Sequence, residues 1–259
     1  MIVETRNGPV SLDQVGEGPD LVMLHSLLSD RHVFDLVVPR LAERHRISLV
    51  DLPGFGSTPL VDASLDLYGD CIGGLLEAGD FDPEVTTILG NGLGGFTALA
   101  TAVRHGDRFN KLILVGCGSS VPPEGKPAFR AMIDKVEKGG MEAVVDLAIA
   151  RIFPAEFIEA NPAMAFARRE VLLRTDPVAF QTACQAIHDA DYDSDVAGIT
   201  NPTLLVVGSE DLATPPALSQ SLAKNIRNAT YVELEGVAHG PQLQAPDRFL
   251  AAIGPFLEA

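Results

Sequence analysis

Two short motifs near the end of the chain contain an imidazole that can act as a general base and a carboxylate that can support it. Asp211 follows an apolar run in the segment GSED at 208–211, and His239 lies in GVAHG at 236–240. An imidazole with an ordinary pKa of about 6.5 can accept a proton near neutral pH. A carboxylate behind it fixes the tautomer and stabilises the imidazolium. We therefore predict that Asp211 and His239 form a general-base pair.

A glycine-rich turn adds a third part to this pattern. Residues 90–95 (GNGLGG) follow an apolar run and open a helical segment, which is the context of a nucleophile elbow of the form G-x-S-x-G. Gly90 and Gly94 supply the small flanks, and Gly92 occupies the position of the nucleophilic serine. The alternative is a plain glycine-rich strand-to-helix turn, which could also serve to bind phosphate. A dinucleotide fingerprint fits poorly because the turn lies in mid-chain and Asp107, the acidic candidate downstream, is in a predicted loop.

The order elbow, Asp, His is the chain order of the α/β-hydrolase triad, and two further segments extend the likeness. Residues 24–28 (LHSLL) resemble the oxyanion loop of that superfamily, usually written His-Gly, and residues 51–58 (DLPGFGST) resemble its D-x-P-G-x-G-x-S loop. The chain therefore resembles the α/β-hydrolase superfamily over essentially its full length. Among subfamilies it looks most like small-molecule hydrolases such as enol-lactonases and C–C bond hydrolases.

The resemblance implies an oxyanion hole made by the backbone N–H groups of Leu93 and of Leu27 or Ser26. Ser26 replaces the usual glycine, so its hydroxyl is either a hydrogen-bond donor or substitute nucleophile, or a loop serine bonded to backbone. His25 is expected to order the loop. With Ser26, both His25 and Asn91 are candidate substrate-binding residues, although Asn91 has the alternative of packing against the helix.

Arginines stand out in the middle of this acidic chain. Arg168 and Arg174 are candidates to clamp a substrate carboxylate, because a guanidinium can bind a carboxylate with two parallel hydrogen bonds. The alternative is that Arg168 and Arg169 pair with nearby acids such as Glu170 on an exposed helix.

The elements that must position these residues alternate between strand and helix patterns. Compact apolar runs, each followed by glycine or a polar residue, predict buried parallel strands at Leu21–Leu24, Arg46–Val50, Thr86–Leu89, Leu112–Val115 and Thr203–Val207, with a short strand at Tyr231–Leu234. Helical patterns lie at Phe34–Glu43, Leu65–Ala78, Gly95–Arg104 and Pro246–Leu257. This alternation predicts an α/β fold, with helices on both faces of a mostly parallel sheet and ligands beyond the carboxyl ends of its strands.

One interval breaks the alternation and predicts a helical lid. Between residues 122 and 197 no strand is expected, and helical patterns occur at Met132–Lys138, Met141–Ile152, Pro154–Ala160 and Pro177–Asp189. We therefore divide the chain into an α/β-hydrolase core at 1–121 and 198–259 and a lid insertion at 122–197.

Composition narrows the class of partner. The 259 residues include 19 Lys and Arg against 35 Asp and Glu, a net charge of −16. A surface this acidic repels nucleic acid and anionic membranes. We therefore expect a small-molecule substrate as the partner. A homodimer is also possible. Three dispersed cysteines indicate neither a disulfide framework nor a metal site, and no cofactor is implied. The absence of a signal-like N-terminus and of a long apolar run favours a cytoplasmic protein.

Glycine at position 92 leaves three hypotheses open. The first is a serine hydrolase for a small ester, lactone or C–C diketone-like substrate, inactivated by the replacement of its serine. The second is an enzyme that uses His239 without a seryl nucleophile, for direct hydrolysis or as a lyase, isomerase or cofactor-independent oxygenase. The third is a non-catalytic binding protein, which the retained Asp211–His239 pair argues against.

Overall fold

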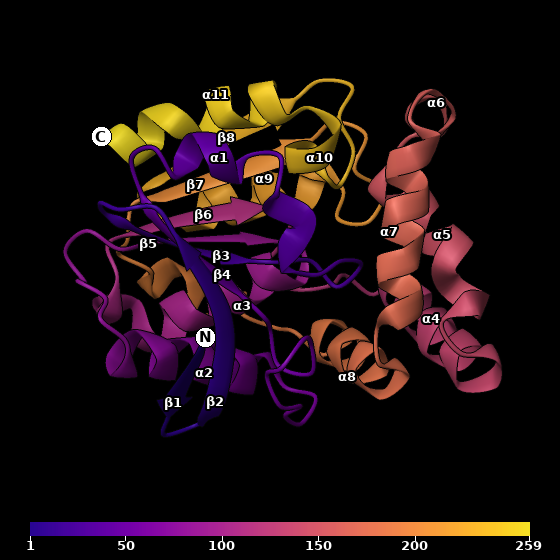
Figure 1. Ribbon diagram of the computed structural model, residues 1–259, viewed down its shortest axis with the longest axis horizontal. Coiled ribbons are helices and arrows are strands. Elements are labelled where there is room, and N and C mark those ends of the chain that lie inside the picture. The colour runs from indigo at the N-terminus through magenta and orange to yellow at the C-terminus, as the bar shows by residue number, and fades with distance from the viewer.

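The structure is a computed structural model that describes residues 1–259, and its centre is an eight-stranded sheet (Figure 1). The strand order is β1-β2-β4-β3-β5-β6-β7-β8. The first two pairs, β1–β2 and β2–β4, are antiparallel, and every other neighbouring pair is parallel. The predicted mostly parallel α/β sheet is thus confirmed. The strands are β1 (Ile2–Thr5), β2 (Gly8–Val15), β3 (Asp20–Leu24), β4 (Arg46–Val50), β5 (Thr87–Asn91), β6 (Lys111–Val115), β7 (Thr203–Gly208) and β8 (Ala229–Leu234).

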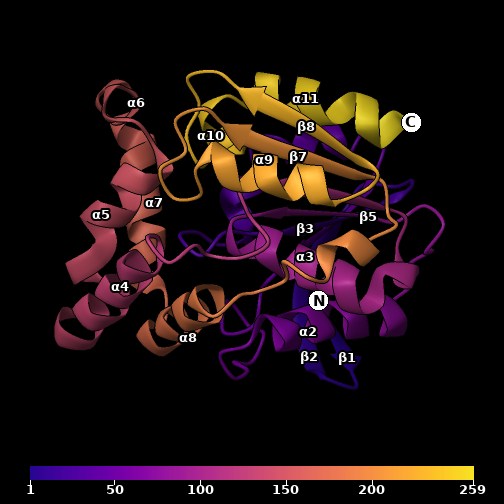
Figure 2. The same ribbon diagram turned by 180° about the vertical axis from the view of Figure 1, so that it is seen from behind.

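Helices cover both faces of the sheet. The helices α1 (Val38–Leu41) and α11 (Pro246–Glu258) lie together on one face, and α2 (Leu65–Ala78), α3 (Leu93–His105) and α9 (Pro216–Asn225) lie on the other (Figures 1 and 2). A short helix, α10 (Pro241–Gln244), follows His239, and 3₁₀ turns occupy Arg31–Phe34, Gly106–Arg108 and Val196–Gly198. The central strands β3 and β5–β7 are almost fully buried because both of their faces are covered.

Five helices between β6 and β7 form a separate group beside the sheet (Figures 1 and 2). They are α4 (Lys126–Gly139), α5 (Glu142–Ile152), α6 (Ala155–Ala160), α7 (Pro162–Arg174) and α8 (Pro177–His188). Within the group α4 contacts α5 and α8, and α5 contacts α7, while α8 also reaches α3 of the core. The group stands at the carboxyl ends of the parallel strands, where ligands are expected.

The structure adds elements that the sequence patterns did not predict. The strands β1 and β2 form an antiparallel edge before the first predicted strand, and α7 and α9 were also missed. The helix expected at Phe34–Glu43 shrinks to the four residues of α1, which follow a 3₁₀ turn and carry Pro39 near their start. No helix of the structure is both long and apolar enough to cross a bilayer.

Candidate active site

The sharp turn between β5 and α3 holds residue 92 in a left-handed conformation. Gly92 has φ +55° and ψ −116°, which a side-chain-bearing residue adopts only with strain. A Cβ on Gly90 or Gly94 would lie 2.0 or 2.1 Å from a backbone carbonyl oxygen, so close packing requires both flanking glycines. A Cβ on Gly92 would instead meet only side chains, at 2.6 Å from Ser26 Oγ and 2.8 Å from His239 Nε2. The geometry of an elbow is therefore present without a side chain at its tip.

His239 and Asp211 meet beyond the carboxyl ends of β8 and β7. Nδ1 of His239 donates a hydrogen bond to Oδ2 of Asp211 over 2.8 Å, and the two side chains are 5% and 1% exposed. Oδ1 of Asp211 accepts from the backbone N–H groups of Ala213 and Thr214, each at 2.8 Å, and the Thr214 hydroxyl donates to Oδ2 over 2.9 Å. Four protein donors thus hold the buried carboxylate in place. Because Nδ1 carries the proton, Nε2 is free to act as a base.

Thr214 belongs to this cluster of polar side chains and was missed by sequence reasoning. Besides its bond to Asp211, its Oγ1 lies 3.2 Å from Nδ1 of His239, so it touches both members of the pair. One feature of the sequence could have pointed to it: Thr214 lies three positions after Asp211. At this spacing an aspartate side chain often accepts a hydrogen bond from a backbone N–H within a turn.

A group of amides behind the elbow fixes the loop that carries His239. Nδ2 of Asn91 donates to the carbonyl oxygens of His239 and Val115 over 3.1 and 3.3 Å. Oδ1 of Asn91 accepts from Nε2 of Gln242 over 3.0 Å, and both amide side chains are buried. The hydrogen-bonding groups of Asn91 are therefore used within the protein, which favours its packing alternative over direct contact with substrate.

His25 holds the oxyanion loop rather than facing a cavity. Its Nδ1 lies 3.0 Å from the carbonyl oxygen of Ser26 and its Nε2 accepts from the backbone N–H of Leu52 over 3.2 Å, so both ring nitrogens are occupied. The ring is fully buried and packs edge-on against Phe55. Burial lowers the pKa of His25, so the neutral ring is favoured. The structure places no atom of His25 where a substrate could bind it, which corrects its assignment as a substrate-binding residue.

Two backbone N–H groups lie free at the tip of the site. Leu93 is the first residue of α3, where an N–H has no partner within the helix, and no other acceptor in the protein bonds to it or to the N–H of Leu27. Between these loops the Ser26 hydroxyl points at His239, with 3.4 Å from Oγ to Nε2. The residues predicted for the oxyanion hole thus border one small volume together with His239.

The space beside His239 is small and mostly apolar. It measures about 30 Å³ and is bordered by Ser26, Gly92 and His239 together with Leu27, Leu28, Leu93, Phe96, Phe129, Met132, Arg151, Ile187, Ala213 and Thr214. Room for about two water-sized groups means that a larger ligand must displace lid side chains, and the flexible Met132 is suited to that. A cleft of about 370 Å³ adjoins it and shares Phe129 and Arg151 with it.

Two arginines of the helices between β6 and β7 reach this region. Arg151 of α5 lies between the inner space and the outer cleft and has no ion pair or hydrogen bond within the protein. Arg168 of α7 borders a second cavity of about 10 Å³ next to Ser26 and His239. Nη1 of Arg168 lies 3.7 Å from Oδ1 of Asp30 and has no hydrogen-bond partner. Arg151 was missed because sequence spacing does not show which lid face turns inward.

The structure places Arg174 elsewhere, which corrects its assignment to the substrate site. It lines a polar cleft of about 360 Å³ with Asp51 and Ser57 that does not include His239. Arg174 lies six positions after Arg168, so their side chains point about 120° apart around a helix. Arg169 pairs with Asp146 rather than with a neighbour on its own helix.

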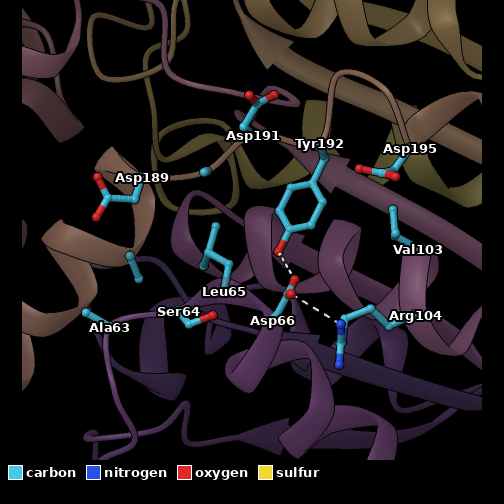
Figure 3. A pocket seen from close by; sticks show the side chains of 12 residues that line it. Ala63, Ser64, Leu65, Asp66, Val103, Arg104, Asp189, Asp191, Tyr192 and Asp195 are labelled. Atoms are coloured by element: carbon cyan, nitrogen blue, oxygen red, sulfur yellow. Dashed lines mark hydrogen bonds and ion pairs between the residues drawn. The ribbon is translucent and has the colours of Figure 1, made fainter.

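Another cleft of about 360 Å³ lies where α2 and α3 meet the segment after α8 (Figure 3). There Tyr192 donates to Oδ1 of Asp66 over 2.8 Å, and Arg104 donates to Oδ2 of the same carboxylate over 3.2 Å. The cleft also holds Asp189, Asp191 and Asp195 but no histidine. These contacts hold the segment after α8 against α2 and α3. The cleft has no histidine that could act as a base, unlike the site around His239.

Comparisons with a family model, with relatives in sequence and with solved structures all point to the same family. A family model described as the alpha/beta hydrolase family matches residues 21–252. A pimeloyl-[acyl-carrier protein] methyl ester esterase from Aeromonas hydrophila is 29% identical over 258 residues, which covers 96% of this chain and 99% of that protein. The esterase of the same name from Neisseria meningitidis serogroup B is 29% identical over 255 residues, covering 93% of this chain and 95% of that one.

Among solved structures, the enol-lactonase from Burkholderia xenovorans LB400 superposes with a TM-score of 0.92 at 26% identity, and the alignment covers 100% of both chains. The likeness therefore includes helices α4–α8 as well as the sheet.

Proposed function

Since the chain belongs to the alpha/beta hydrolase family and is a hydrolase-like enzyme, we propose that the site around Asp211 and His239 hydrolyses small carboxylic esters or lactones. One arrangement carries this proposal: His239, supported by Asp211, borders the same small volume as Leu27 and Leu93, whose backbone N–H groups have no acceptor within the protein. A base and two oxyanion donors on one small volume are what ester hydrolysis requires.

In this mechanism His239 takes the proton of the attacking hydroxyl at Nε2. As the carbonyl becomes tetrahedral, its negative oxygen receives hydrogen bonds from the N–H groups of Leu27 and Leu93. The imidazolium, stabilised by Asp211, then gives its proton to the departing alcohol oxygen.

The lid, for which we propose residues 122–197, selects the substrate. The mostly apolar lining supplied by Phe129 and Met132 suits a hydrocarbon chain. Arg151 has no partner within the protein and Arg168 has one unpartnered nitrogen, so either can bind an anionic group at the far end of that chain. We therefore propose an ester or lactone that also carries a carboxylate. The relatives named above act on a methyl ester and an enol-lactone by their descriptions, which supports this class.

The test is hydrolysis of p-nitrophenyl esters of increasing acyl length by the chain, by Gly92→Ser and by His239→Ala in both backgrounds. We expect hydrolysis that depends on His239 in at least one background. Hydrolysis that survives His239→Ala, or no ester cleaved in either background, contradicts the proposal. An Asp62→Asn variant is the matched control, since that carboxylate is exposed and has no side-chain partner.

A further inference from the structure

We propose that Ser26, on the oxyanion loop, is the nucleophile of this site and replaces the serine that residue 92 lacks. This inference rests on the proposed ester hydrolysis and names the group that the proposal leaves open. Its starting point is a pair of distances: Oγ of Ser26 lies 3.4 Å from Nε2 of His239, and 2.6 Å from the position of a Cβ on residue 92. The hydroxyl thus approaches the base from almost the place that an elbow side chain would fill.

A side chain at 92 and the Ser26 hydroxyl in its present position exclude each other sterically. A contact of 2.6 Å between a carbon and the Ser26 oxygen is shorter than real Cβ contacts, so an ordinary residue at 92 would push the Ser26 hydroxyl away from His239. Glycine at 92 leaves that hydroxyl its place. The two departures from the family pattern, Gly92 and Ser26, therefore compensate each other.

The Ser26 hydroxyl is free for this role, whereas its backbone is rigid. Nε2 of His239 is the one hydrogen-bond partner of its Oγ. Its carbonyl oxygen contacts His25 Nδ1 at 3.0 Å and accepts from both the N–H and the hydroxyl of Ser29, each at 3.2 Å. A fixed backbone with an uncommitted hydroxyl is typical of a positioned nucleophile, and catalytic hydrogen bonds are often long before substrate binds.

The oxyanion donors suit attack from Ser26. In an elbow, the N–H of the residue after the nucleophile points at the developing oxyanion. Leu27 follows Ser26 as Leu93 follows Gly92, and both N–H groups are free. A carbonyl attacked by Ser26 therefore has two donors at the same tip of the site.

Acylation of Ser26 and its later hydrolysis conserve atoms and electrons. Oγ of Ser26 bonds to the ester carbonyl carbon while its proton passes to Nε2 of His239, and the carbonyl π electrons move onto oxygen. Collapse breaks the bond to the alcohol oxygen, which takes the proton from Nε2. Water then attacks the acyl-Ser26 ester and gives its proton to Nε2, and collapse to the acid returns a proton to Oγ. The net reaction converts ester and water to acid and alcohol.

Two further features agree with this assignment. One is a cavity that can hold the attacking water, and the other is that the nearby Cys117 thiol stays protonated and is a poor nucleophile. A cavity of about 10 Å³, room for about one water, borders Ser26 and His239 and is lined by the buried Gln242, whose Oε1 has no protein partner. Cys117 packs behind the elbow, where burial raises the pKa of its thiol far above the ordinary value and keeps it protonated.

Trapping with diethyl p-nitrophenyl phosphate, followed by intact mass and peptide mapping, tests the inference. We expect one diethylphosphoryl adduct on Ser26 of the unmodified chain, none in Ser26→Gly or His239→Ala, and a normal adduct in Ser221→Ala, an exposed serine on α9. Ester turnover should fall at least about a hundredfold in Ser26→Gly, whose circular dichroism and Tm show whether it is folded.

An unlabelled chain, an adduct at another residue, or a folded Ser26→Gly that keeps the original turnover overturns the assignment. The last result leaves the proposed ester hydrolysis intact and points to direct attack by water. Failure of the proposed function is read separately, from the loss of all His239-dependent hydrolysis both in the unmodified chain and in Gly92→Ser.

Discussion

A side chain on residue 92 would point at His239: an ideal Cβ on Gly92 lies 2.8 Å from Nε2 of the imidazole. Gly92→Ser should therefore bring a hydroxyl within reach of the base at some cost in stability. Backbone strain at φ +55° costs about 1–3 kcal/mol, and reduced chain entropy in the unfolded state returns about 0.4–1 kcal/mol. We expect a net loss of about 1 kcal/mol in the free energy of unfolding, measured by urea titration.

Crowding with Ser26 adds to that cost and can be isolated by a double-mutant cycle. Ser26→Gly restores the usual His-Gly loop and removes the oxygen that the new Cβ would approach. The double variant Gly92→Ser/Ser26→Gly should therefore be more stable than the sum of the single effects, by about 0.5–3 kcal/mol. Additive effects in urea titrations of all four proteins would show that the two residues do not exclude each other.

Asp211→Asn should abolish most activity while the chain stays folded. The amide cannot hold the Nδ1–H tautomer or stabilise the imidazolium, and the corresponding change in a serine protease lowers kcat by about 10⁴. We expect kcat for a p-nitrophenyl ester to fall to the level of His239→Ala, with KM changed little. An Asp211→Asn protein with unaltered kcat would remove the carboxylate from the mechanism.

Asn91→Ala should weaken the support of His239 without touching the reacting atoms. The carbonyl oxygen of His239 would lose its donor and Gln242 would lose its acceptor, and one unsatisfied buried group costs about 1–3 kcal/mol. We expect a lower Tm together with a lower kcat at unchanged KM. Asn225→Ala, on the exposed surface of α9, is the matched control and should change neither.

The lid arginines should discriminate between charged and neutral esters. Replacing Arg151 or Arg168 by Ala should raise KM for a mono-p-nitrophenyl ester of a dicarboxylic acid by about tenfold or more, since a hydrogen bond to a charged group contributes about 1.5–3 kcal/mol. KM for p-nitrophenyl butyrate should stay the same. Arg174→Ala, which changes an arginine of the separate polar cleft, should alter neither value.

His25 makes stability depend on pH. Burial lowers its pKa below the ordinary 6.5 in the folded chain, so below that value the unfolded state binds more protons than the folded one. The contribution of His25 is present above pH 6.5 and is lost as the pH falls through its folded pKa. Between about pH 7 and pH 5 the free energy of unfolding should fall less steeply in His25→Asn than in the unmodified chain. Asn225→Ala, which changes an exposed residue without a titratable group, should keep the original slope.

Local patterns were sufficient to predict the parallel strands and the residues at their ends. Compact apolar runs mark buried strands, and the carboxyl ends of parallel strands meet at one edge, so Gly92, Asp211 and His239 converge. The hairpin of β1 and β2 was missed although its turn carries the pair Asn7-Gly8, a local hairpin signal. The pairing of β2 with β4, which is distant in the sequence, leaves no local pattern. The helix α7 was missed because its apolar residues follow no single face.

The arrangement of the lid was the least predictable part of the site. A helix turns each residue by about 100°, so Arg168 faces the cavity beside His239 while Arg174 faces another cleft. Which face turns inward is decided by packing between α5, α7 and the core, and the sequence of one helix does not contain that information. Arg151 was missed for the same reason, because the sequence of α5 does not show which of its faces turns toward the site.

Burst kinetics with p-nitrophenyl acetate most directly test the claim that Asp211 and His239 form the base pair of an ester-hydrolysing site beside the turn at residue 92. In Gly92→Ser/Ser26→Gly, which places the serine on the elbow and glycine on the oxyanion loop, we expect a burst of one p-nitrophenol per protein molecule, the sign of an acyl-enzyme. Adding His239→Ala should remove the burst. A folded double variant that releases p-nitrophenol without a burst, or one whose burst survives His239→Ala, would contradict the claim.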